Sequence, residues 1–290
     1  MKSNGAKLRA IIEERRAVIV PGVANALGAR IVADLGFEAV YITGAGVNNT
    51  FYGIPDLGFA GLAEIAQHTS AISGAVDLPL VVDIDTGFGN AVNTYHTVKT
   101  IERAGANAIQ LEDQSMPKRC GHFAGKSFVS TDEMVAKIRA AADARVSDDF
   151  LIIARTDVLV LDGFEAAVER CHRFIEAGAD MTFVEAVEND ADLRSIPARL
   201  SVPQVLNIVV GGKTPVVSQS ELQKLGFGLV LYANTALQGA IVGMHSALKQ
   251  LKDAGRMDEG DPRVASFGER QRLVQKTLFD ALEKKYASEK

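Results

Sequence analysis

The chain has 290 residues and a formal net charge of −5, and 47% of its residues are hydrophobic while 23% are charged. This composition is typical of a soluble globular protein, and the negative charge gives no electrostatic reason to expect nucleic acid or an anionic membrane as a partner. The first residues lack the apolar core of a signal peptide, and no apolar run reaches the roughly 18 residues of a membrane span. We therefore expect a cytoplasmic protein.

Eight short apolar segments that are rich in β-branched residues recur along the chain. They begin at Ala17, Ala39, Leu78, Ala108, Phe150, Met181, Pro203 and Gly228. Nearly continuous apolar runs of this kind are typical of parallel strands that are covered on both faces. The pattern therefore predicts a parallel sheet of eight strands.

Segments with helical periodicity separate these strands. Examples are Ala91–Ala104, Thr131–Ala144, Phe164–Ala177 and Ser218–Leu225. Several helical segments end at a glycine suited to a left-handed C-terminal cap, namely Gly36, Gly105, Gly178 and Gly226. With no separating linker, and no G-x-G-x-x-G after the first strand, the repeated units predict an α/β fold of the (β/α)₈ TIM-barrel type.

The C-terminal part of the chain exceeds what such a barrel needs. We expect the barrel over about 17–250, and the charged segment after Asp253 has helical periodicity over roughly Ser266–Lys285. The whole chain, 1–290, is then one domain whose helical extension, about 254–290, packs on a neighbouring subunit.

Acidic residues stand where the third and fourth strands end. Active sites of such barrels lie at the carboxyl ends of the strands, and Asp83 and Asp85 share one face of a strand because side chains alternate. A polar residue that merely caps its strand would explain any one position. It would not explain the set, because grouped carboxylates repel each other unless a cation joins them. With Glu112 from the next strand, the pattern predicts a site for Mg²⁺ or Mn²⁺.

Arg155, at the end of the fifth strand, indicates an anionic substrate. A guanidinium group matches a carboxylate with two parallel hydrogen bonds. The alternative is an ion pair with Asp157 or Glu185. The turn at 43–46, Thr-Gly-Ala-Gly, offers backbone N–H groups to an anion with little side-chain bulk.

The segment Met116–Lys126 places one of the two cysteines of the chain, Cys120, among Arg119 and His122. Positive neighbours lower a thiol pKa and make the group usable as an acid, a base or a nucleophile. The alternative is a solvated basic loop with an incidental cysteine. Cys171 lies inside a helical pattern, where a small buried core residue is expected.

Four motifs resemble those of the isocitrate lyase/phosphoenolpyruvate mutase superfamily. They are P-K-R-C-G-H at Pro117–His122, V-D-I-D-T-G-F-G-N at Val82–Asn90, L-E-D-Q at Leu111–Gln114 and N-I-V-V-G-G-K-T-P at Asn207–Pro215. The resemblance runs from Pro21 to about Leu248, and K-R-C-G-H is typical of the lyase branch. Phosphonomutases of the family carry a loop with asparagine in place of this cysteine. The resemblance also implies a homotetramer that exchanges a C-terminal helix between subunits.

The resemblance implies roles for the matching residues. Asp83 would contact Mg²⁺ directly, Asp85 and Glu112 would do so mainly through water, and Cys120 would be the general acid. The residues that would bind or surround the substrate are Thr43, Gly44, Ala45, Asp56, Lys118, Arg119, Gly121, His122, Arg155, Glu185 and Asn207. The motifs do not identify the general base, and Tyr41 is the first residue to test.

These observations favour a carbon–carbon lyase that acts on a dicarboxylate or tricarboxylate such as 2,3-dimethylmalate or 2-methylisocitrate. The alternatives are a phosphonomutase, a hydrolase or decarboxylase of oxaloacetate, and a barrel that serves only for binding. Many relatives have a glutamate where this chain has Val210, and many lyases have a proline near the position of Ala233. If Val210 faces the pocket, an apolar side chain there favours a dialkylmalate over methylisocitrate.

Overall fold

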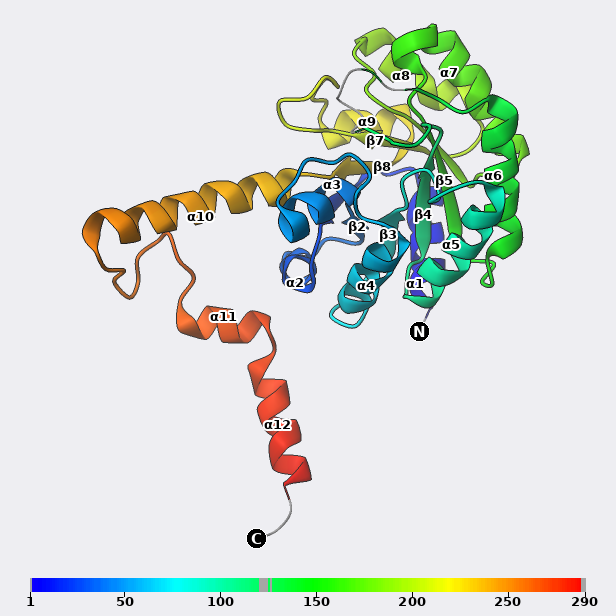
Figure 1. Ribbon diagram of the computed structural model, residues 1–290. Helices are drawn as coiled ribbons and strands as arrows, with labels where there is room; N and C mark the ends of the chain where they lie inside the picture. Colours follow the sequence, from blue (N-terminus) through cyan, green and yellow to red (C-terminus); the bar gives the residue numbers. More distant parts are fainter. Residues whose placement is uncertain (1, 120–124, 126, 288–290) are drawn as a thin grey trace.

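The protein forms a closed barrel of eight parallel strands in sequential order, as seen in a computed structural model that describes residues 2–119, 125 and 127–287 (Figure 1). The strands are β1 (Val18–Val23), β2 (Val40–Ile42), β3 (Leu80–Asp83), β4 (Ala108–Glu112), β5 (Leu151–Thr156), β6 (Met181–Val184), β7 (Gln204–Asn207) and β8 (Phe227–Tyr232). The barrel is closed by pairing between β1 and β8. The predicted (β/α)₈ architecture is confirmed.

Helices surround the barrel. They are α2 (Ala26–Asp34), α4 (Leu62–Ser73), α5 (Ala91–Arg103), α6 (Thr131–Ala144), α7 (Leu159–Glu176), α8 (Asp190–Arg199) and α9 (Gln219–Leu225). A short helix α3 (Gly44–Val47) and a π-helical turn (Asn48–Tyr52) follow β2. Helix α7 begins before the predicted Phe164 because its first turn is joined to the rest across Gly163, which has φ 84°. The helical periodicity identified the remainder of α7 correctly.

Helix α1 (Asn4–Glu13) closes one end of the barrel. Its buried residues Leu8, Ile11 and Ile12 belong to the same hydrophobic cluster as the first residues of several strands, among them Val18 and Leu151. These strand residues mark the amino ends of the strands. The barrel is therefore open only at the carboxyl ends, where the active sites of such barrels lie.

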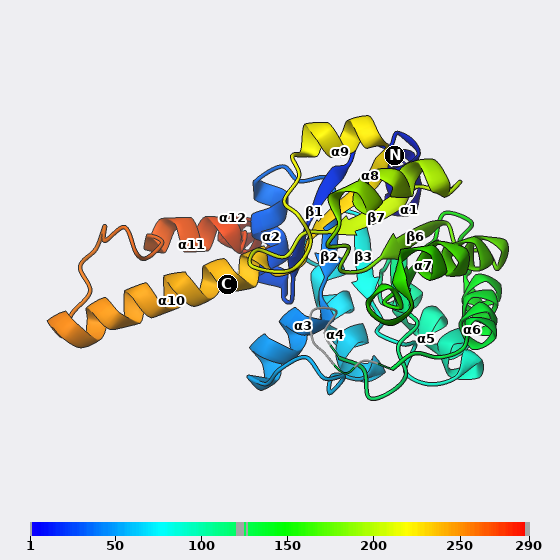
Figure 2. The ribbon, with the colours of Figure 1, turned by 90° about the horizontal axis from the view of Figure 1, so that it is seen from above.

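The C-terminal arm leaves the barrel directly after β8. It consists of α10 (Thr235–Ala254), α11 (Phe267–Leu273) and α12 (Lys276–Tyr286), and it extends to one side in both views (Figures 1 and 2). None of the residues of α10 is buried. The arm thus begins earlier than the expected position near 254, because α10 does not cover the barrel of its own chain. No helix in the described part of the chain is long and apolar enough to span a membrane.

Candidate active site

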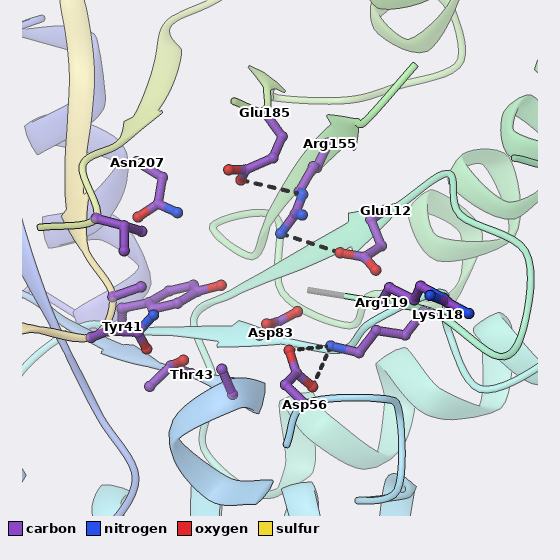
Figure 3. A pocket seen from close by; sticks show the side chains of 14 residues that line it. Tyr41, Thr43, Asp56, Asp83, Glu112, Lys118, Arg119, Arg155, Glu185 and Asn207 are labelled. Atoms are coloured by element: carbon purple, nitrogen blue, oxygen red, sulfur yellow. Dashed lines mark hydrogen bonds and ion pairs between the residues drawn. The ribbon is translucent and has the colours of Figure 1, made fainter. Parts of the chain in front are cut away.

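A polar pocket opens at the carboxyl ends of the strands (Figure 3). Its lining residues are Tyr41, Thr43, Ala45, Asp56, Asp83, Glu112, Lys118, Arg119, Arg155, Glu185, Asn207, Val209, Ala233 and Asn234. Most of the strand-end residues that the sequence singled out therefore converge on one pocket, whereas Asp85 and Gly44 are not among its described lining residues. Val209 and Asn234 were not predicted to bind substrate, and Ala233 was named only as a position near which many lyases have a proline.

The turn after β2 lies close to the carboxylates that end β3. Thr43 caps α3 by accepting a hydrogen bond from the Gly46 N–H at 3.3 Å, and the Gly44 N–H donates to Asp83 Oδ2 at 3.3 Å. A Cβ atom on Gly44 would stand 3.2 Å from Asp83 Oδ2 and 3.3 Å from Asp85 Oδ1. Glycine thus allows the backbone to approach these carboxylates, as it does wherever backbone must come close to a polar group.

Asp83, Asp85 and Glu112 are all buried. Asp83 Oδ1 accepts hydrogen bonds from the Asp85 N–H at 3.1 Å and from Gln110 Nε2 at 3.4 Å. Asp85 adopts a left-handed backbone conformation with φ 49°, which turns the chain away from the strand direction. Burial raises the pKa of Asp85 to about 7 and that of Glu112 well above its usual range.

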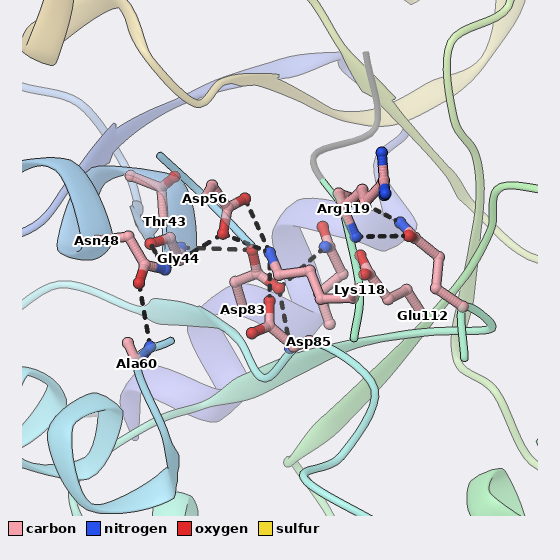
Figure 4. Close-up of polar contacts among 12 residues, drawn as sticks. Thr43, Gly44, Asn48, Asp56, Ala60, Asp83, Asp85, Glu112, Lys118 and Arg119 are labelled. Atoms are coloured by element: carbon pink, nitrogen blue, oxygen red, sulfur yellow. Dashed lines mark hydrogen bonds and ion pairs between the residues drawn. The ribbon is translucent and has the colours of Figure 1, made fainter. Parts of the chain in front are cut away.

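Lys118 reaches into this acidic cluster (Figure 4). Its Nζ atom lies 2.7 Å from Asp56 Oδ1 and 2.7 Å from Asp85 Oδ1, and the side chain is 3% exposed. The negative charges of Asp85, Glu112 and Asp56 outweigh the effect of burial and hold the pKa of Lys118 well above its usual range. The resemblance placed Lys118 and Asp56 on two separate segments around the substrate, and the structure joins them through an ion pair.

The three predicted metal ligands were not all expected to touch the cation, since the resemblance implies that Asp85 and Glu112 act mainly through water, and this stays a prediction. Among the residues that the structure describes, no group of three or more His, Cys, Asp or Glu side chains is arranged to hold a metal ion. Asp85 is paired with Lys118 instead. Asp83 and Glu112 still line the pocket, and Glu112 Oε1 is buried without a hydrogen-bond partner among the described residues. These oxygen donors fit a hard cation that keeps much of its water, as Mg²⁺ does.

Arg155 lines the pocket and is also paired with carboxylates. Its Nε and Nη2 atoms donate to Asp157 Oδ2 at 2.8 Å and Oδ1 at 2.9 Å. Its Nη1 atom lies 3.2 Å from Glu112 Oε2, and its Nε atom lies 3.5 Å from Glu185 Oε2. These carboxylates outweigh burial and raise the pKa of Arg155, so the guanidinium remains charged. Arg155 therefore forms the ion pairs that were the alternative interpretation and also lies in the pocket lining, and its binding of an anionic substrate stays a prediction.

Tyr41 does not have the properties of a general base. Its hydroxyl donates to Gln110 Oε1 at 3.1 Å, and burial, followed by the charge of Asp83, raises its pKa well above the usual range. Gln110 must keep this orientation, because its amide nitrogen faces a carboxylate that can only accept. A phenol that already donates its proton and resists ionisation is poorly suited to remove one from a substrate.

Val210 lies outside the pocket lining of the described residues and is 56% exposed. Its carbonyl accepts a hydrogen bond from Gln238 Nε2 at 3.2 Å, and Val209 lines the pocket in its place. Strand β7 ends at Asn207, so the alternation of strand side chains does not extend to these valines. Cys120, Gly121 and His122 lie outside the described residues.

Comparison with known proteins gives consistent matches over nearly the whole chain. Residues 8–252 match the family model described as phosphoenolpyruvate phosphomutase. The chain is 38% identical to the 2,3-dimethylmalate lyase of Eubacterium barkeri over 290 residues, which cover 99% of both chains. It is 42% identical to the 2-methylisocitrate lyase of Aeropyrum pernix over 251 residues, which cover 87% of this chain and 80% of that one.

Comparison with solved structures also gives matches over nearly the whole chain. The crystal structure of a 2,3-dimethylmalate lyase in its trigonal form superposes with a TM-score of 0.92 at 33% identity, covering 99% of this chain and 97% of that one. An oxaloacetate acetylhydrolase in complex with 3,3-difluorooxalacetate gives 0.90 at 33% identity, with 97% and 95% covered. A phosphonopyruvate hydrolase in complex with oxalate and Mg²⁺ gives 0.89 at 29% identity, with 98% and 99% covered.

Proposed function

The chain belongs to the phosphoenolpyruvate mutase/isocitrate lyase superfamily, and we propose that it is a Mg²⁺- or Mn²⁺-dependent carbon–carbon lyase. Its substrate would be a substituted malate of the 2,3-dimethylmalate or 2-methylisocitrate type. The observation that carries this proposal is that one pocket combines oxygen donors for a hard cation, Asp83 and Glu112, with the cations Arg155 and Lys118. This combination suits a polycarboxylate whose reacting end is a 2-hydroxy acid.

In this proposal, the carboxylate of the 2-hydroxy acid binds at the turn of Thr43, Gly44 and Ala45 and at the Nη1 side of Arg155. Charge-assisted hydrogen bonds from the guanidinium would give both affinity and orientation. Lys118 and Arg119, which also line the pocket, would face the second carboxylate. The buried side-chain oxygen of Asn207 has no hydrogen-bond partner among the described residues, and it would meet a donor of the bound substrate or of ordered water. Glu185 also lines the pocket and would complete its wall.

Cleavage breaks the C2–C3 bond after the C2 hydroxyl loses its proton. A bound Mg²⁺ would supply the positive charge that acidifies this hydroxyl. The electron pair of the broken bond passes to C3, where it is delocalised into the neighbouring carboxylate, and Cys120 then donates a proton to that carbon. From 2,3-dimethylmalate the products are pyruvate and propionate. Tyr41 would orient the substrate as a hydrogen-bonding group rather than remove its proton.

Hydrolysis of oxaloacetate is the second candidate, because the same pocket can stabilise an enolate and the fold superposes closely on an oxaloacetate acetylhydrolase. A phosphonomutase is disfavoured by Cys120, which stands where those enzymes carry a loop with asparagine. A screen of alkylmalates, methylisocitrate, isocitrate and oxaloacetate with Mg²⁺ separates these functions. Release of a 2-oxo acid from an alkylmalate supports the lyase, whereas oxalate and acetate from oxaloacetate alone would replace it with the hydrolase.

We also propose that the protein assembles as a homotetramer in which the C-terminal arm packs on a second copy of the chain. An apolar groove between β1, α2 and α10 includes exposed side chains such as Leu27, Ile31, Leu35 and Met244. Helix α10 itself exposes Ile241, Val242, Leu248 and Leu251. Exposed apolar surfaces of this extent are typical of interfaces between subunits. Analytical ultracentrifugation tests the assembly, and a monomer at micromolar concentration would contradict it.

A further inference from the structure

We propose that Asp113 and Arg170, which lie outside the pocket lining, position the Arg155 guanidinium for binding the substrate carboxylate. They act through Asp157 and are therefore positioning residues rather than catalytic ones. The inference rests on the proposed function only in assigning a carboxylate to Arg155.

Asp113 directly follows Glu112, the last residue of β4, but the two side chains have different surroundings. Glu112 lines the pocket, whereas Asp113 is fully buried outside its lining and meets the backbone that follows β5. Asp113 Oδ2 accepts from Thr156 Oγ1 at 2.6 Å, and Oδ1 accepts from the Asp157 N–H at 2.9 Å. The Asp113 carboxylate thus holds the backbone at the point where Asp157 leaves the strand.

Asp157 in turn fixes the rotation of the Arg155 side chain. It binds the Nε and Nη2 edge of the guanidinium with two hydrogen bonds, so the Nη1 atom is the one directed toward Glu112 and the pocket. The guanidinium carbon of Arg155 lies over the ring of Phe183, 5.4 Å from the ring centroid. Two hydrogen bonds and this cation–π contact limit the freedom of the guanidinium, and a group held in this way loses little entropy when a ligand binds.

Arg170, on α7, supplies the positive charge for Asp113. Its Nε atom lies 3.2 Å from Asp113 Oδ2, and its Nη2 atom donates to the Val129 carbonyl at 2.6 Å. The Val129 N–H donates to the Asp113 carbonyl at 2.9 Å, which closes a small network around Asp113. Because Arg170 carries the positive charge nearest to the buried Asp113 carboxylate, removing Arg170 would let Asp113 shift, and the hydrogen bond from the Asp157 N–H to Asp113 would weaken.

The test compares Arg170→Met with Arg173→Met, a matched control on the same helix. Arg173 pairs with Asp132 at 3.0 Å on the surface instead of with Asp113 or Val129. Oxalate, in the presence of saturating Mg²⁺, serves as the dicarboxylate probe in titration calorimetry well below the melting temperature. We expect Arg170→Met to raise the Kd of oxalate about tenfold, as expected when a charged hydrogen bond is misaligned. The Kd of Mg²⁺ alone should not change, and Arg173→Met should behave as the wild type.

An unchanged oxalate Kd in folded Arg170→Met would overturn the inference, even if its melting temperature fell, since a purely structural role predicts that result. If Arg170→Met does not fold, Arg170→Lys decides, because lysine keeps the charge but cannot meet both acceptors with a planar fork. A wild-type Kd in Arg170→Lys would then contradict the positioning role, and a Kd raised several-fold would support it. Failure of the wild-type protein to bind oxalate would instead contradict the proposed function and remove the premise.

Discussion

Lys118 Nζ lies 2.7 Å from Asp85 Oδ1, and both side chains are buried. This contact joins the segment after β4 to the segment after β3. It also changes how the acidic cluster is balanced, because the cation next to Asp85 is a residue of the chain. The metal site proposed at Asp83 and Glu112 therefore shares its surroundings with an internal positive charge, which limits the repulsion among the carboxylates.

The first prediction concerns the stability that Lys118 provides. Lys118→Met should lower the free energy of unfolding by about 3–5 kcal/mol at pH 8, because Asp56 and Asp85 would be left as buried charges without their partner. Urea unfolding measures the change. Lys213→Met is the control, since Lys213 forms an exposed pair with Glu188 and should contribute less than about 1 kcal/mol. Equal losses of unfolding free energy in the two variants would show that the buried ion pair stabilises the protein no more than the exposed one.

The same variant predicts a pH dependence. The pKa of Asp85 is already raised to about 7 by burial, and loss of Lys118 raises it further. A carboxyl whose pKa is higher in the folded than in the unfolded protein favours folding more as the pH falls through the folded value. The difference in free energy of unfolding between the wild type and Lys118→Met should therefore become smaller as the pH falls from 8 to 5.5. A deficit that grows over this range would contradict the assignment.

A further prediction concerns the dependence of activity on a metal ion. Exhaustive chelation should abolish turnover, and Mg²⁺ or Mn²⁺ should restore it, because Asp83 and Glu112 in the described pocket lining offer oxygen donors, which these hard cations prefer. Zn²⁺ should not restore it. Metal analysis of the treated protein accompanies the assay, and full activity in a protein without bound metal would contradict the site.

The two cysteines should differ in their importance for activity and in their reactivity. Cys120→Ser should keep Mg²⁺ and oxalate binding but lose lyase activity by on the order of 10²-fold or more, as for removal of a general acid. Cys171 is fully buried and its pKa is raised to about 12, so it should resist alkylation in the native protein, and Cys171→Ser should remain active. Peptide mass spectrometry after iodoacetamide treatment and steady-state assays give both answers. If Cys171→Ser lost activity while Cys120→Ser kept it, Cys171 would be the thiol that takes part in the reaction.

Substrate preference is expected to depend on Val209 rather than Val210. The wild type should have a higher kcat/KM for a dialkylmalate than for methylisocitrate, because Val209 contributes an apolar side chain to the pocket. Val209→Thr should reduce this advantage about three- to fivefold, since one buried methyl group contributes about 1 kcal/mol. Val210→Thr should leave it unchanged. A wild-type preference for methylisocitrate would refute this account of the pocket without affecting the lyase assignment.

The barrel could be predicted from the sequence because parallel strands covered on both faces must be apolar throughout, and each of the eight runs met that condition. The position of the C-terminal arm was harder to predict. The apolar periodicity of α10 indicates that one of its faces is covered, but it does not indicate which chain covers it. Val210 was favoured over Val209 because many relatives carry a glutamate at its position. Since β7 ends at Asn207, strand alternation does not determine which of the two valines faces the pocket.

The residues around the pocket show a second limit. Strand ends in a barrel converge by geometry, so Asp83, Glu112 and Arg155 could be placed together from their positions alone. The ion pair of Lys118 with Asp56 joins loops 62 positions apart in the sequence, and no periodic pattern indicates such a contact. The hydrogen bond from the Asp157 N–H to Asp113 joins the segments after β5 and β4, and no periodic pattern indicates this contact either.

The central claim is that this pocket cleaves the C2–C3 bond of a substituted malate. The most direct test incubates the wild-type protein with 2,3-dimethylmalate and Mg²⁺ in D₂O and follows the products by NMR. The account predicts equimolar pyruvate and propionate, with one deuterium at C2 of each propionate formed by cleavage, and no products after chelation. Absence of propionate under conditions in which the same protein converts oxaloacetate to oxalate and acetate would contradict it.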